Sequence, residues 1–128
     1  MTDPHRYSKI LTHLGITRMG RGKPFECEVT VSAWVEEKLA TKHGIEIWEI
    51  EEVIYDDPNA FSLRHRDCYF VYGQTSSGRY LLSLVRVLER EDVLKLGFAS
   101  GTNLVKVITA RYMNQRQRHD YVTRKRER

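Results

Sequence analysis

The spacing of apolar residues changes at Phe61, and this change constrains the fold more than any other feature of the chain. Upstream, between Ile47 and Ile54, apolar residues recur every three or four positions, as they do on one face of a helix. Downstream, β-branched and aromatic residues approach the alternation that is typical of strands. The sequence therefore predicts an α+β fold in which two helices precede an antiparallel sheet.

The first predicted helix lies between Ser32 and Gly44. Ser32 is a suitable N-cap residue, and Gly44 can adopt the left-handed conformation that closes a helix, with Ile45 completing a Schellman motif. Lys42 and His43 fall in the last turn, where the helix dipole favours cations. Both side chains are therefore expected at a defined helix end, and not in a loose loop.

The second predicted helix covers residues 47–56 and ends at Asp57-Pro58, because a residue before proline disfavours the helical conformation. Three of its acidic residues, Glu49, Glu51 and Glu52, are expected on the side opposite the apolar stripe.

The sheet is predicted to contain about four strands, over residues 61–64, 69–72, 80–88 and 103–110. The links between them are short enough for antiparallel neighbours. Residues 73–78 are expected to form a hairpin turn, and residues 89–102 a longer polar connection.

Both ends of the chain differ in character from the sheet. A basic helix is predicted to start at Met113, where Asn114 as N-cap and Gln117 three positions later form an amide version of the capping box. Residues 1–28 show no sustained period and are predicted to be an appendage, so that a single domain covers residues 29–128. A short strand over residues 28–32 is also compatible with the pattern.

Charge is strongly segregated along the chain. Residues 1–33, 34–60 and 61–128 carry net charges of +2, −6 and +8, which together give the overall +4. The basic segment is expected to attract polyanions such as a phosphate backbone, in a salt-sensitive manner. The alternative is that its Arg and Lys residues simply face solvent. We expect a cytoplasmic protein that does not bind membranes, because no stretch resembles a membrane span or a signal peptide.

The sequence offers no pattern for a metal or a cofactor. Cys27 and Cys68 stand alone and are expected to be reduced thiols. The five histidines show no ligand spacing. Neither a phosphate-binding loop nor a nucleophile elbow is present, so neither nucleotide binding nor acyl transfer is indicated.

Basic and aromatic residues form the remaining pattern of chemical interest. Metal-free RNA cleavage needs a base for the ribose 2′-hydroxyl, cations for the growing phosphate charge and an acid for the 5′-oxygen. His and Lys can transfer protons, and Arg can hold phosphate oxygens. Arg79, after a turn, and Arg111, at a strand end, can converge on one rim of the sheet. His43 also fits a purely structural role at a helix end. The full set is Lys42, His43, Arg64, His65, Arg66, Arg79, Arg111, Tyr112, Arg116, Arg118 and Tyr121.

The order of several short motifs resembles the BrnT-type toxins of bacterial toxin–antitoxin pairs, over about Val29 to Arg126. The motifs are Trp34…Glu37-Lys38…Lys42-His43-Gly44-Ile45, Asp56-Asp57-Pro58, Arg66…Tyr69-Phe-Val-Tyr-Gly73, Gly78-Arg79-Tyr-Leu81 and Val107-Ile-Thr-Ala-Arg111…Arg118…Tyr121. The resemblance implies a RelE-like fold and a metal-independent endoribonuclease that arrests growth. It also implies an antitoxin partner, typically a small ribbon-helix-helix DNA-binding protein.

On this hypothesis, the catalytic residues are Arg79 and Arg111, which hold the scissile phosphate, and Lys42 or His43, which transfers protons. Further RNA contacts are expected from Arg66, Arg116, Arg118 and Tyr121, although the helical spacing of Tyr121 also fits packing.

The chain departs from the family pattern at Gln117, which replaces a usual Glu and removes a carboxylate that could orient a neighbouring Arg. The connection over residues 89–102 is longer than usual, and residues 1–28 have no counterpart. Two alternatives remain open on the same scaffold: a non-catalytic RNA-binding module, and a module that docks an acidic segment of a protein partner.

Overall fold

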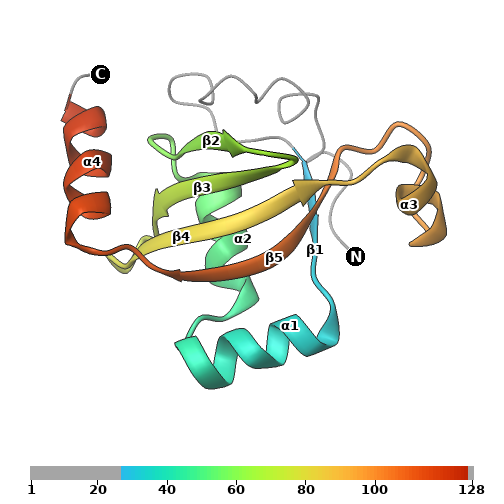
Figure 1. Cartoon of the computed structure of the whole chain (residues 1–128), viewed down its shortest axis with the longest axis horizontal. Helices are drawn as coiled ribbons and strands as arrows, with labels where there is room; N and C mark the ends of the chain where they lie inside the picture. The colour runs from blue at the N-terminus through green and yellow to red at the C-terminus, as the bar shows by residue number, and fades with distance from the viewer. Residues whose placement is uncertain (1–26, 127–128) are drawn as a thin grey trace.

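A five-stranded sheet forms the centre of the molecule in the computed structural model, which describes residues 27–126 (Figure 1). Most of the predicted appendage, residues 1–26, lies outside the described residues. The elements in chain order are β1 (Glu28–Thr30), α1 (Ala33–Lys38), the π-helical segment η3 (Leu39–His43), α2 (Ile47–Asp56), β2 (Phe61–His65), β3 (Cys68–Gln74), β4 (Tyr80–Val87), α3 (Arg90–Lys95), β5 (Leu104–Tyr112) and α4 (Gln115–Arg126).

The strand order is β1-β5-β4-β3-β2. Strands β2 to β5 are antiparallel neighbours, as predicted, but β1 joins the sheet as a fifth strand parallel to β5. The sheet is therefore mixed and has five strands, not about four antiparallel ones. The direction of a three-residue strand is set by a partner late in the chain, which local periodicity does not report.

The first helix begins and ends where the sequence predicted, but its second half is wider than an α-helix. The Ser32 side chain accepts a hydrogen bond from the Val35 amide at 3.2 Å. Gly44 is left-handed with φ of 64°, and the Ile45 amide donates to the Leu39 carbonyl at 3.0 Å. The predicted Schellman-type ending is therefore confirmed, and it places His43 at the end of η3.

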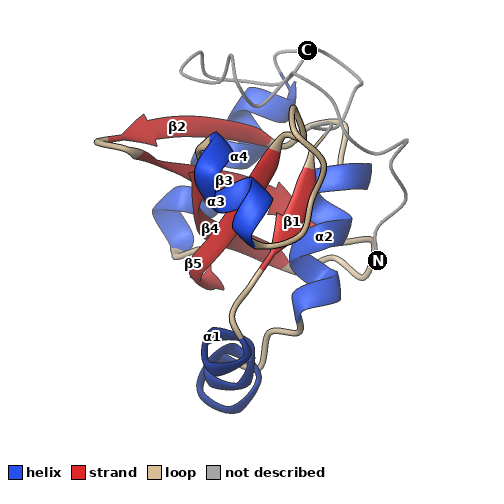
Figure 2. Ribbon diagram, turned by 90° about the vertical axis from the view of Figure 1, so that its right-hand side faces the viewer, coloured by secondary structure: helices blue, strands red, loops and turns tan. Residues whose placement is uncertain are grey.

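Two apolar clusters cover the two faces of the sheet. Helix α2 buries Ile50, Val53 and Ile54 on one face, where η3 also packs. On the other face, Tyr121 of α4 packs with Phe61 and neighbouring residues of the sheet. Figure 2 shows α2 and α4 on opposite sides of the strands. The sheet therefore presents two different chemical environments at the end where β5 leads into α4.

The connection between β4 and β5 contains a helix, α3, that was not predicted. Only Val93 of α3 is buried, so no apolar stripe marks this helix in the sequence. The last helix starts at Gln115, directly after the predicted N-cap Asn114. Its capping box is confirmed, because Asn114 and Gln117 exchange hydrogen bonds of 2.9 and 2.8 Å.

Cys27 and Cys68 are both buried free thiols. Burial, and to a smaller extent the negative charge of Glu28, raises the pKa of the Cys27 thiol well above its ordinary value of 9.0. As pH rises through the ordinary value of 9.0, the thiol ionises in the unfolded chain but stays protonated in the folded one. The free energy of unfolding therefore falls.

We therefore expect the free energy of unfolding of the wild-type protein to fall above pH 9 by up to about 1.4 kcal/mol per pH unit, relative to Cys27→Ala. Urea titrations from pH 7 to 10 measure this difference. Below pH 8, the free energies of unfolding of the two proteins should change with pH in the same way. The same pH dependence at all pH values would contradict the expectation.

Candidate nucleic-acid interface

Several predicted site residues lie at or next to the end of β5, and Tyr112 links the elements there. Its hydroxyl donates to the carbonyl of Gly44 at 3.2 Å, which ties the end of β5 to the end of η3. Lys42 is exposed and His43 is partly exposed, immediately before Gly44. We refer to Lys42, His43, Arg79, Arg111 and Tyr112 as the β5-end cluster.

Arg79 is held firmly on the α2 side of this cluster. One guanidinium nitrogen, Nη1, pairs with Glu49 Oε2 at 2.7 Å, and Nη2 donates to the Gly44 carbonyl at 3.1 Å. The guanidinium carbon lies 4.6 Å from the centre of the Tyr112 ring. The charge of Arg79 is therefore paired with that of Glu49, and its hydrogen bond to Gly44 fixes the backbone that follows His43.

Glu49 does not lie on the exposed side of its helix, as the sequence predicted. Its side chain is 2% exposed, whereas that of Arg79 is 41% exposed. The second Glu49 oxygen, Oε1, accepts a hydrogen bond from the Glu46 amide at 3.0 Å. The capping bond and the pairing with Arg79 together compensate the burial of this carboxylate.

Arg111 points to the opposite face of the sheet from Arg79. In the β4–β5 register, Arg111 pairs with Leu82 and Tyr112 pairs with Leu81. Paired residues share a face and successive residues alternate, so Arg111 lies on the α4 face and Tyr112 on the α2 face. Arg79 and Arg111 therefore lie at the same end of the sheet, as expected, but on opposite faces of it, so their side chains do not converge.

The Arg111 guanidinium is oriented by uncharged acceptors, which leave its positive charge unpaired by them. Its Nη1 donates to the Tyr112 carbonyl and to Gln117 Oε1, both at 3.0 Å. The same Gln117 oxygen accepts from the Asn114 amide at 2.9 Å. The amide therefore orients Arg111, a function for which the sequence suggested that a carboxylate was needed. Within residues 27–126, no carboxylate lies at salt-bridge distance from Arg111, which is exposed.

Helix α4 adds exposed cations to the same face. Arg116 and Arg118 are exposed, and the Arg118 guanidinium lies 4.6 Å from the centre of the Tyr80 ring. The Arg124 guanidinium lies 4.4 Å from the Phe61 ring. Stacking on aromatic rings restricts these guanidinium groups while leaving their edges available to phosphate.

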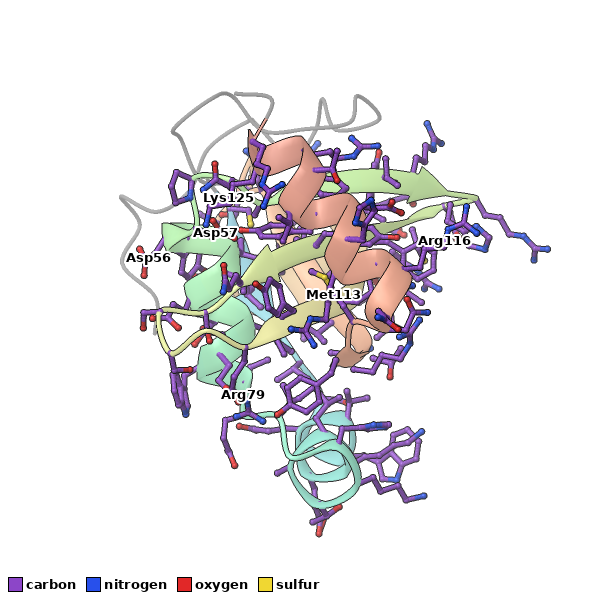
Figure 3. The ribbon with its side chains drawn as sticks, turned by 90° about the vertical axis from the view of Figure 1, so that its left-hand side faces the viewer. Asp56, Asp57, Arg79, Met113, Arg116 and Lys125 are labelled. Atoms are coloured by element: carbon purple, nitrogen blue, oxygen red, sulfur yellow. The ribbon has the colours of Figure 1, made fainter. Side chains whose placement is uncertain are left out.

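Two predicted RNA contacts are placed elsewhere. Tyr121 is 1% exposed, and its hydroxyl donates to Asp57 Oδ2 at 2.7 Å, so it packs in the core and cannot stack on a base. Arg66 is exposed with φ of 60° in the β2–β3 turn. Because the strands are antiparallel, this turn lies at the other end of the sheet from Arg79. Figure 3 shows Arg79 below α2, apart from Arg116 on α4.

Three residues of the site were missed or misjudged from the sequence. Tyr112 was noted only as an aromatic among cations, Glu49 was expected on the polar side, and Gln117 was noted only for its capping geometry and for the lack of a carboxylate that could orient a neighbouring Arg. The position of Glu49, four residues before the buried Val53, is the one local signal of its inward orientation.

Three further properties of residues 27–126 concern metal ligands, shifted pKa values and membrane-spanning helices. No group of three or more His, Cys, Asp or Glu side chains in residues 27–126 is arranged to hold a metal ion. The pKa of Tyr72 is raised, mainly by burial and then by Asp120, while Arg111 and Arg124 act in the opposite sense. Within the same residues, no helix is long and apolar enough to cross a membrane.

Comparison with known proteins gives one structural likeness to report. No family model and no curated protein matches the chain. The crystal structure of the Brucella abortus ribonuclease toxin BrnT is similar at 13% sequence identity and a TM-score of 0.48, over 70% of this chain and 99% of that chain. This likeness is one of overall α+β arrangement; it assigns no role to any residue and does not extend to family membership.

The different surroundings of the two arginines predict different effects on stability. Arg79→Ala leaves the Glu49 carboxylate buried without its partner and should lower the free energy of unfolding by about 2 kcal/mol, less than for a fully buried pair because Arg79 is partly exposed. Arg111→Ala should change it by no more than about 0.5 kcal/mol. Urea denaturation of both variants measures this, and equal effects would contradict the assignment of Arg79 as a structural residue.

Proposed function

We propose that this protein is a metal-independent endoribonuclease that acts as the toxin of a bacterial type II toxin–antitoxin pair. The observation that carries the proposal is the state of Arg111, which is exposed, oriented by two acceptors and free of any carboxylate partner in the described chain. A cation of this kind is suited to stabilise charge that grows on a phosphate during cleavage.

The proposed reaction is attack of a ribose 2′-oxygen on the adjacent phosphorus. The bond from O2′ to phosphorus forms and the bond from phosphorus to O5′ breaks, and O5′ takes up the proton that the base removed from the 2′-hydroxyl, directly or through water. His43 or Lys42 in its neutral form accepts the 2′-hydroxyl proton. Within residues 27–126, Arg111 forms its hydrogen bonds through Nη1 alone, so Nε and Nη2 can donate to the phosphate oxygens.

In this proposal Arg79 does not hold the phosphate, although the sequence first assigned it that role. Its contacts with Glu49 and with the Gly44 carbonyl support a positioning role instead, in which it fixes the end of η3 and so the backbone beside His43. Arg116 and Arg118 hold the RNA backbone from α4.

The proposed partner is a small antitoxin, of the ribbon-helix-helix DNA-binding type that the family resemblance implies. An acidic antitoxin segment that covers Arg111 and the α4 arginines would compete with RNA for the same charges.

The test is induction of the gene in a bacterial host, with and without the neighbouring gene, followed by mapping of RNA 5′-ends. Growth arrest with new 5′-ends, both relieved by the neighbouring gene, is the expected result. In vitro cleavage should persist in EDTA. Salt-sensitive RNA binding with no cleavage, including in the presence of ribosomes, would instead favour a non-catalytic RNA-binding module.

A further inference from the structure

Helix α4 covers only one end of its face of the sheet, and the remainder of that face has a distinct composition. Directly paired residues lie in rows across the strands. The first row packs under α4, where Phe61 and Leu82 are buried and only Arg111 is exposed; it comprises Phe61, Tyr72, Leu82 and Arg111. Tyr121 and Arg124 of α4 contact this row at Phe61.

The second row lies beyond α4 and is more open. It comprises Leu63, Phe70, Leu84 and Thr109, of which the first three are partly exposed and Thr109 is exposed. The third row follows at the far end, where His65 pairs with the buried Cys68 and Arg86 pairs with Lys106. The alternate residues of β5, Val105 and Val107, are buried in the opposite cluster, which confirms that Lys106 faces this side.

The two open rows combine flat apolar surface with cations. The rings of His65 and Phe70 lie 5.3 Å apart, so they form one continuous patch. Arg86 and Lys106 border this patch, and Arg111 borders it on the side of α4. Arg86 Nε lies 3.9 Å from Oδ2 of Asp67, whose side chain is largely exposed, and the carboxylates Glu89 and Asp92 line one pocket with Arg86.

We propose that these two rows, which we call the open face, bind single-stranded RNA beside the cleavage site, with Phe70 stacking on a base and Lys106 and Arg86 contacting the backbone. Aromatic surface flanked by cations is the arrangement with which proteins bind single strands. RNA fits better than an acidic protein segment because the cations of the open face continue into Arg111 and the α4 arginines. Together they form one continuous row of cations along which a phosphate backbone can lie. This inference rests on the proposed function and extends it to the path of the substrate.

The test measures binding of a fluorescein-labelled, fully 2′-O-methylated 12-nucleotide RNA by fluorescence anisotropy, because methylation removes the attacking hydroxyl. Phe70→Leu keeps an apolar side chain but removes the ring, and should weaken binding by about fivefold or more. Phe70→Tyr keeps an aromatic ring and should bind the RNA within about twofold of the wild-type affinity.

Lys106→Gln tests the cation and carries little risk to folding, since its side chain is partly exposed. It should weaken binding and lower the slope of log affinity against log salt by about 0.7. Lys95→Gln removes the same charge from α3, outside the sheet (Figure 1), and should leave the slope unchanged.

Wild-type affinity in folded Phe70→Leu and Lys106→Gln would overturn the inference while leaving the proposed nuclease intact, provided that the wild type still cleaves RNA. If the two variants keep RNA binding but lose binding to the product of the neighbouring gene, the open face is a protein-docking surface and the inference is wrong. If the wild type neither binds nor cleaves RNA, the proposed function fails together with it.

Discussion

Replacing Arg111 with alanine is expected to abolish growth arrest and to slow RNA cleavage by about 10²- to 10³-fold, the usual cost of removing one preorganised donor from a developing oxyanion. The guanidinium is oriented before substrate arrives, because Gln117 and the Tyr112 carbonyl hold its Nη1 at 3.0 Å. No buried group depends on its charge in the described chain, so the loss should be functional and not structural. Cleavage of a labelled RNA under single-turnover conditions measures it.

Two controls separate this role from general RNA binding. Arg111→Lys keeps the charge but loses the planar fork, and should recover only part of the rate. Arg118→Ala removes another exposed arginine, from α4, and should weaken RNA binding with little effect on the rate at saturating RNA. A folded Arg111→Ala protein that is as toxic as wild type would refute the role of Arg111.

The parts of the fold that were predicted from the sequence are those fixed by local interactions. Helix α2 occupies the predicted residues 47–56, because its apolar spacing and Asp57-Pro58 act within a few residues of each other. Gly44 closes η3 and Asn114 caps α4 for the same reason. Such signals require no knowledge of the remainder of the chain.

The faces on which the site residues lie depend on partners distant in sequence, and these were not predictable. Arg79 and Arg111 are both near strand ends, but a shift of pairing by one residue moves a side chain to the other face. The partner of Arg79, Glu49, lies 30 positions away. Residue type and order thus pointed to a basic cluster, while the pairing register decided which of its cations remain free.

The same dependence on distant contacts makes Asp57 a central structural residue, although the sequence indicated only a helix end. Its Oδ1 accepts from the Asn59 amide at 2.9 Å. Its Oδ2 accepts from the Gln74 amide at 2.8 Å and from the Tyr121 hydroxyl at 2.7 Å. One largely buried carboxylate therefore joins α2, β3 and α4. At neighbouring Gly73, a β-carbon would overlap the Val53 side chain, so β3 and α2 are already in close contact here.

Asp57→Ala is therefore expected to lower the free energy of unfolding by about 3–5 kcal/mol, because three donors lose their acceptor and each buried donor left without one costs about 1–3 kcal/mol, less where water can replace the carboxylate. A pocket of about 240 Å³ beside Asp57 can admit water to some of these donors, which favours the lower end of the range. Urea denaturation measures the change.

The neighbouring Asp56 provides the matched control, since it is exposed and carries the same charge. Asp56→Ala should change stability by no more than about 0.5 kcal/mol. Tyr121→Phe removes one of the three donors and should cost about 1–2 kcal/mol, but only while Asp57 is present to accept its hydrogen bond. If Tyr121→Phe is equally costly in the Asp57→Ala background, the Tyr121 hydroxyl does not act through Asp57, and the proposed link between α2 and α4 through this carboxylate is wrong.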